Sequence, residues 1–334
     1  MRSTGSIFEA YLDEAARGRE SLWRLAAASL FIASSTFFVS LIIMLVAGLA
    51  ALAEDRSVNG LRTWMESPAL AACMLLAIGA VLPMTAIAVY VFHRRNPTGV
   101  LGPGGRLSWR QFARAFAITA VVIATVNAVG LAISPRIERS SLAFGGWLLQ
   151  APLFGGLILL QSAAEEYLFR GYLVQTLARR FGNPIVWCGA PATLFGLMHW
   201  NPSLNSAMNV GTTTAMALFA VAATLLVVRT GNLGASIGLH FANNLVYLLI
   251  ISEPAWSRPI ALYLSPAIAS EGWATPSALI VGALSLAAIP VATTLLLHRR
   301  SPFNITSGAQ ALARPAQAGA HAVQEREGGT LAEL

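Results

Sequence analysis

The sequence predicts an all-α fold, that of a polytopic helical membrane protein with about eight transmembrane helices. Of its 334 residues, 56% are hydrophobic and only 11% are charged, whereas a soluble domain carries about 25% charged residues. Runs of about 20 mostly apolar residues, long enough to cross a roughly 30 Å hydrocarbon core as helix, recur along the chain. We therefore expect one membrane-embedded body and no separate soluble domain.

The expected elements follow from the order of apolar segments. At residues 6–20, Phe8, Tyr11 and Leu12 follow helical spacing among charged residues, which predicts an amphipathic helix on the membrane surface. The eight apolar segments expected to form transmembrane helices lie at 23–53, 68–92, 112–134, 146–164, 184–198, 208–228, 233–251 and 275–297. After Arg300 the composition changes to Ala, Gly, Gln and Glu without periodicity, which predicts a disordered tail.

The basic residues predict the orientation in the membrane. The formal net charge is +7, and every basic residue is an arginine. With the N-terminus inside, arginines in the predicted cytoplasmic segments outnumber those in the outer loops by about two to one, so both termini are predicted to be cytoplasmic. Because the arginines gather at helix ends, we interpret the charge as contact with membrane lipid and expect no nucleic-acid partner.

Three charged residues stand at the end of the fourth apolar segment, in AAEEYLFRGYL at residues 163–173. An ionisable side chain at bilayer depth costs about 2.5 to 3.5 kcal/mol, which makes it a candidate for function. On an α-helix, Glu166 and Arg170 form an i, i+4 pair in the favourable order. Glu165 is rotated about 100° from Glu166, so we expect the pair to brace the helix while Glu165 projects into a cavity as the reactive carboxylate. The alternative is that the apolar span ends near Ala164 and all three charges are interfacial.

Two later segments carry further polar side chains. His199 ends the fifth apolar segment in LFGLMHW, one turn after Phe195, and His240 and Asn244 share a face of an apolar helix in LHFANN. Singly, each could be interfacial or could hold helices together. Together with Glu165 they supply a carboxylate, two imidazoles and an amide from three helices. That set is suited to activating a water molecule and stabilising an oxyanion.

The three motifs resemble those of a known family. EEYLFRG, FGLMH and HFANN match the EExxxR, FxxxH and HxxxN motifs of the CAAX-processing and bacteriocin-processing (CPBP) intramembrane proteases, also called Abi or type II CAAX prenyl endopeptidases. The resemblance covers about residues 145–250. It implies that Glu165 and His199 polarise the attacking water. It also implies that His240 and Asn244 stabilise the tetrahedral oxyanion.

The resemblance leaves the cofactor open between two alternatives. Members of the family are described as metalloproteases, and a metal-independent glutamate mechanism has also been argued for them. The sequence allows both, because Glu165, His199 and His240 could be the three protein ligands of a catalytic zinc ion with water in the fourth position. If Glu165 binds zinc, another base is required, and Glu166 is the nearest candidate for that catalytic role.

The resemblance also gives Arg170 and Phe195 the role of structural support, and it divides the chain into five parts. These are an N-terminal cytoplasmic or interfacial helix (1–22), family-variable transmembrane helices (23–144), the protease core (145–250), a last loop with its transmembrane helix (251–300) and a disordered cytoplasmic tail (301–334).

The sequence therefore predicts an intramembrane endopeptidase that hydrolyses a peptide bond of a membrane-associated protein or peptide, presented at the cytoplasmic half of the membrane. The lysine-free composition suggests a bacterial chain, which predicts the inner membrane as its location. One alternative is a non-proteolytic binding or immunity factor of the same fold. A second is a proton-coupled transporter that uses the same side chains as a relay, although no inverted repeat is visible in the sequence.

Overall fold

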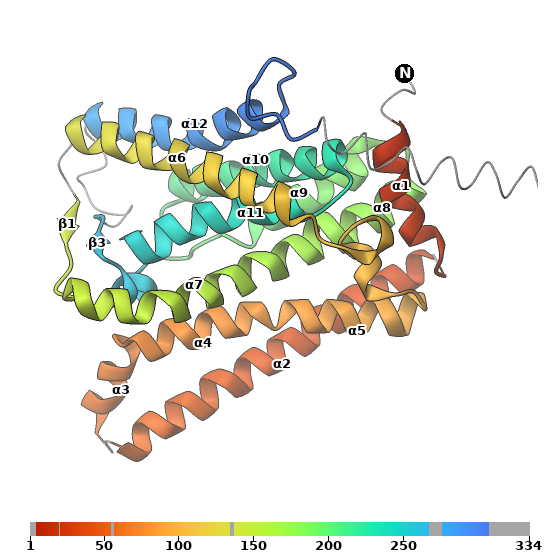
Figure 1. The fold of residues 1–334 in the computed structure, drawn as a ribbon. Helices are drawn as coiled ribbons and strands as arrows, with labels where there is room; N and C mark the ends of the chain where they lie inside the picture. The colour runs from red at the N-terminus through yellow and green to blue at the C-terminus, as the bar shows by residue number, and fades with distance from the viewer. Residues whose placement is uncertain (1–4, 20, 55–56, 134–136, 267–275, 307–334) are drawn as a thin grey trace, which may run out of the picture.

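The computed structural model describes residues 5–19, 21–54, 57–133, 137–266 and 276–306, which form a helical bundle (Figure 1). The α-helices are α1 (Gly5–Ala16), α2 (Leu22–Glu54), α3 (Val58–Met65), α4 (Pro68–Gly79), α5 (Val81–His93), α6 (Trp109–Ile133), α7 (Phe144–Glu166), α8 (Val174–Arg180), α9 (Ala190–Leu197), α10 (Ser206–Thr230), α11 (Gly234–Asn244) and α12 (Pro276–Leu297). Most of the predicted disordered tail, from residue 307 onward, lies outside the described residues.

Eight described segments match the eight apolar segments predicted from the sequence. Five are long and apolar enough to cross a membrane, namely Leu22–Glu54, Pro68–His93, Trp109–Ile133, Phe144–Arg180 and Ser206–Thr230. Three shorter apolar helical segments lie at Ile185–Leu197, Gly234–Ile250 and Gly282–Leu297. The all-α membrane fold is therefore confirmed, while the number of helices that cross and the direction of crossing stay predictions.

Helix α7 is the central element of the bundle. It packs against α4 and α5 on one side and against α11 on the other (Figure 1). Helix α11 packs in turn against α6 and α10. Because α7 carries the two adjacent glutamates and α11 carries His240 and Asn244, the α7–α11 contact brings two of the three sequence motifs together.

A glycine permits the close approach of α11 to α6. A Cβ atom placed on Gly238 would clash with the backbone of Phe112, so a larger residue would push the two helices apart. The same holds for Gly234, one turn earlier, against the carbonyl of Ser108. This small-residue spacing is typical of tightly packed membrane helices. It holds His240, two residues beyond Gly238, at a fixed depth in the bundle.

A small three-stranded sheet closes the end of the bundle opposite α1 (Figure 1). Its strands are β1 (Glu138–Arg139), β2 (Ile251–Ser252) and β3 (Tyr263–Leu264), in the order β1-β3-β2. β3 pairs antiparallel with β1 and parallel with β2. The sequence analysis did not predict this sheet, because two-residue strands are too short to show alternation.

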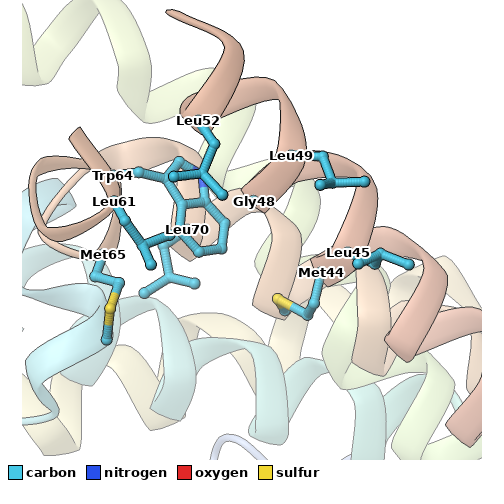
Figure 2. A pocket seen from close by; sticks show the side chains of 9 residues that line it. All are labelled: Met44, Leu45, Gly48, Leu49, Leu52, Leu61, Trp64, Met65 and Leu70. Atoms are coloured by element: carbon cyan, nitrogen blue, oxygen red, sulfur yellow. The ribbon is translucent and has the colours of Figure 1, made fainter. Parts of the chain in front are cut away.

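An apolar cavity of about 390 Å³ lies between α2, α3 and α4 (Figure 2). Leu45, Trp64 and Leu70 are among the side chains that line it. None of its lining residues is ionisable, so this cavity lacks the groups that hydrolysis requires. It also lies at the end of the bundle opposite α1, away from the end of α7 that carries the glutamates (Figure 1).

The predicted N-terminal helix is present as α1 and packs against the bundle, while its placement at the membrane surface stays a prediction. Tyr11 and Ala15 are fully buried, and α1 contacts α8 and α10. The Tyr11 hydroxyl lies 3.0 Å from the Val100 carbonyl oxygen and 3.2 Å from that of Arg170, and it donates to this pair. Burial raises the pKa of the Tyr11 phenol above its usual range, which keeps the proton on the donor. Periodicity cannot separate a lipid-facing apolar stripe from a protein-facing one.

We predict that Tyr11→Phe lowers the thermal unfolding temperature of the detergent-purified protein. The change leaves two buried carbonyl groups without this donor, which costs about 1–3 kcal/mol of unfolding free energy. Tyr90→Phe is the matched control, because Tyr90 is 65% exposed on α5 and the same change there should have little effect. Equal unfolding temperatures for Tyr11→Phe and wild type would show that α1 is not anchored through this hydroxyl.

Candidate active site

The helix that carries the two glutamates changes its winding directly after them. α7 ends at Glu166, and the chain continues as a π-helix from Tyr167 to Leu173 before α8 begins. A π-helix accommodates extra backbone per turn, and such segments often occur at functional sites. A second π-helix, Ile185–Gly189, directly precedes α9. A third, Leu245–Ile250, directly follows Asn244. One π-helix thus begins within the first motif, directly after its glutamates, and another directly follows the third motif.

The predicted pairing of Glu166 with Arg170 is present. Arg170 Nη1 lies 3.0 Å from Glu166 Oε1, and both side chains are buried to 1% exposure or less. The contact lacks the geometry of a hydrogen bond, so charge attraction dominates it. By contrast, the Glu165 side chain is 16% exposed. Glu166 and Arg170 are therefore buried in the protein interior, and the depth of the three charges in the membrane stays a prediction.

Aromatic rings surround the buried guanidinium of Arg170. Its Cζ atom lies 4.3 Å from the ring centroid of Phe195, 5.7 Å from that of Phe219 and 5.9 Å from that of Phe169. The negative face of an aromatic ring attracts a cation, most strongly where water is excluded. Phe195 comes from α9 and Phe219 from α10, so the cation joins these helices to the π-helix after α7.

His240 lies between the two glutamates. Its Nδ1 atom is 2.8 Å from Glu166 Oε1, and its Nε2 atom is 3.5 Å from Glu165 Oε2. Because an ionised carboxylate only accepts hydrogen bonds, the short contact to Glu166 favours a proton on Nδ1. The ring also packs edge-on against Phe219, with centroids 4.9 Å apart. The structure therefore brings together Glu165, Glu166 and His240.

His199 is oriented by the backbone of its own helix. Its Nδ1 atom lies 2.8 Å from the carbonyl oxygen of Phe195, and a carbonyl oxygen can only accept, so Nδ1 carries the proton. Nε2 then keeps its lone pair in the neutral ring, which suits an acceptor or a base. The Phe195 ring lies 4.8 Å from the His199 ring and 6.1 Å from the His240 ring. Among the described contacts, the ion pair of Glu165 involves His240 and not His199.

The loop after His199 is held by a buried asparagine that the sequence analysis missed. Asn209, at 1% exposure on α10, donates from Nδ2 to the carbonyl oxygens of Asn201 and Leu204. Its Oδ1 accepts from the backbone N–H of Asn201. These three bonds fix the turn between α9 and α10, and with it the position of His199 at the end of α9.

Asn244 is paired with a residue that was also missed. Its Nδ2 donates to Gln161 Oε1 over 2.8 Å, from α11 to α7. Gln161 is 4% exposed and stands one turn before Glu165 on the same helix. The sequence contained a signal for it, since a polar residue four positions from Glu165 within an apolar span shares its helix face. Asn209 carried no comparable signal, because its partners are backbone groups of a loop.

The zinc alternative stays a prediction for this site. Within the described ranges, no group of three His, Cys, Asp or Glu side chains is placed to hold a metal ion. His199 contacts the Phe195 carbonyl through Nδ1, and His240 contacts Glu166 through Nδ1. These contacts leave the Nε2 atom of each ring as the one that would meet a metal ion or a water. Hydrolysis at this site can be described with side chains of this chain alone, and metal dependence is a question for experiment.

Comparison with known proteins agrees with the sequence motifs. Residues 146–246 match the family model described as Type II CAAX prenyl endopeptidase Rce1-like. The chain is also similar to a protein of Bacillus subtilis (strain 168) named as uncharacterized protein YyaK, with 28% identity over 176 residues. That match covers 52% of this chain and 58% of the relative. No solved structure matches the chain.

The matched region contains all three motifs and spans the central α7 and α11 helices. The family model and the motifs thus agree independently of the fold. Over residues 146–246 the chain is similar to the Type II CAAX prenyl endopeptidase Rce1-like family, as the motifs predicted.

Proposed function

We propose that this chain is an intramembrane endopeptidase that uses Glu165 and His199 to activate water and His240 and Asn244 to stabilise the oxyanion. The observation that carries the proposal is the convergence of Glu165 and Glu166 on His240, at 3.5 and 2.8 Å, inside an apolar bundle. Three ionisable groups at such depth are costly to retain unless they serve a function.

Glu165 is the carboxylate suited to meet water. Its side chain is 16% exposed, whereas that of Glu166 is fully buried. In the proposed reaction, Glu165 accepts a proton from water as the water oxygen attacks the scissile carbonyl carbon. The Nε2 lone pair of His199 accepts a second hydrogen bond from the same water and orients it. When the C–N bond breaks, Glu165 returns the proton to the leaving amine.

His240 and Asn244 supply donors for the developing oxyanion. With both ring nitrogens protonated, His240 donates to Glu166 through Nδ1 and offers Nε2 to the oxyanion. In that state Arg170 offsets the charge of Glu166 and His240 offsets that of Glu165, so the four groups are neutral together. Asn244 adds the N–H that does not bond Gln161. Donors fixed in a dry site stabilise transition-state charge strongly.

Glu166 and Arg170 support the site. Glu166 binds His240 and Arg170 at the same oxygen, Oε1, and so connects α7, the π-helix after it and α11. The substrate proposed is a membrane-associated protein or peptide, presented at the cytoplasmic half of a bacterial inner membrane. The glutamates stand at the α1 end of α7, which is the cytoplasmic end in the predicted orientation (Figure 1).

We predict that Glu165→Gln and Glu165→Ala lower the cleavage of a quenched fluorescent peptide library by the detergent-purified protein. The expected loss is at least about 100-fold, as is usual when a general base is removed. The unfolding temperature should stay near that of wild type, because Glu165 is not part of the buried Arg170 pair. Glu54→Gln, an exposed glutamate at the end of α2, is the control and should cleave normally.

Each protein is also assayed with a zinc chelator. If the chelator leaves wild-type cleavage unchanged, the glutamate mechanism is supported. If the chelator abolishes cleavage, the mechanism depends on a metal ion. If wild type cleaves nothing, or if Glu165→Ala cleaves as well as wild type, the protease assignment fails and the binding-factor alternative takes its place.

We predict that Glu166→Gln, unlike Glu165→Gln, destabilises the fold. It leaves a buried guanidinium without its carboxylate, and breaking a buried pair costs about 3–5 kcal/mol of unfolding free energy. The control is Glu66→Gln, which breaks an exposed i, i+4 pair with Arg62 and should change the unfolding temperature little. The measurement is thermal unfolding in detergent. Wild-type stability of Glu166→Gln would argue against a supporting role.

A further inference from the structure

We propose that Gln161 is a positioning residue for Asn244, setting the direction in which Asn244 offers its N–H to the oxyanion. Gln161 belongs to none of the three motifs. The inference rests on the proposed role of Asn244 as an oxyanion donor. It adds that α7 controls the orientation of the Asn244 amide through Gln161.

The contact between the two amides is short and enclosed. Asn244 Nδ2 donates to Gln161 Oε1 over 2.8 Å, and Gln161 is 4% exposed. The same Gln161 oxygen accepts from the hydroxyl of Ser162 at 3.3 Å. With Oε1 facing Asn244, the Gln161 oxygen accepts from both the Asn244 amide and the Ser162 hydroxyl.

The other end of Asn244 is held as well. Its Oδ1 accepts from Asn243 Nδ2 at 3.0 Å. The amide plane is therefore fixed at both ends, with the oxygen towards Asn243 and the nitrogen towards Gln161. An amide nitrogen carries two hydrogens, and Gln161 accepts one of them. The second hydrogen points in a direction that Gln161 determines.

Position along the helix places this pair beside the reacting groups. Gln161 precedes Glu165 by one turn on α7, and Asn244 follows His240 by one turn on α11. The two helices thus contact each other through two polar layers. In one layer His240 meets the glutamates, and in the next Asn244 meets Gln161.

Loss of the Gln161 oxygen would free the Asn244 amide to rotate. In an apolar interior an unpaired amide N–H seeks another acceptor, so the donor would leave its productive direction. An oxyanion exists only after water has attacked. A misdirected donor therefore lowers kcat while leaving KM nearly unchanged.

The test uses the peptide that wild type cleaves fastest in a quenched fluorescent library, with rates expressed per folded protein in detergent. Gln161→Met removes the acceptor at similar side-chain length, and Gln161→Ala removes it in a smaller side chain, so one variant serves if the other does not fold. Each is expected to lower kcat about tenfold with KM near wild type, less than the roughly 10²–10³-fold loss for removal of an oxyanion donor by Asn244→Ala. Gln150→Met on the same helix is the matched control and should keep wild-type kcat.

Each Gln161 variant is then combined with Asn244→Ala. If Gln161 acts through Asn244, the double variant is no slower than Asn244→Ala alone. Multiplied losses, or wild-type kcat in both Gln161 variants, would overturn the proposal while leaving the role of Asn244 intact. Wild-type activity of Asn244→Ala, or no cleavage by wild type, would instead overturn the proposed function, and this inference with it.

Discussion

The rest of the site depends on how the chain accommodates one buried cation. Arg170 is 1% exposed within an apolar bundle, where an uncompensated charge costs several kcal/mol. The Glu166 carboxylate at 3.0 Å and the ring of Phe195 at 4.3 Å compensate for this charge. Since these partners come from different segments, the requirement to compensate Arg170 also fixes where α9 and the end of α7 meet. His240 is held at the same Glu166 oxygen, so the support of the fold and the arrangement of the site share one carboxylate.

The two neighbouring glutamates differ in environment although they are adjacent in sequence. Glu166 faces the cation and is fully buried, whereas Glu165 remains 16% exposed and reaches His240 only at 3.5 Å. A carboxylate that is fully buried beside a cation is less able to meet a reacting water. This difference supports the proposed division of labour, in which one glutamate holds the site together and the other takes part in proton transfer.

Polar contacts beyond the motifs complete this arrangement. Asn209 binds the loop that follows His199, Gln161 binds Asn244, and Tyr11 of α1 reaches the carbonyl of Arg170. Each contact joins segments that are remote in sequence or separated by a loop. The N-terminal helix is therefore part of the scaffold that surrounds the site.

The sequence by itself determined the membrane fold, the positions of eight apolar segments and the i, i+4 pairing of Glu166 with Arg170, because hydropathy and helical periodicity are local properties. It also indicated that His240 and Asn244 share a face, since that depends on helix geometry alone. Only the tertiary structure decided that His240 lies between both glutamates, that Gln161 accepts from the Asn244 amide and that α1 packs against the bundle. These facts depend on contacts between segments that are distant in sequence. Helical spacing predicts the direction of a side chain but not the partner that it contacts.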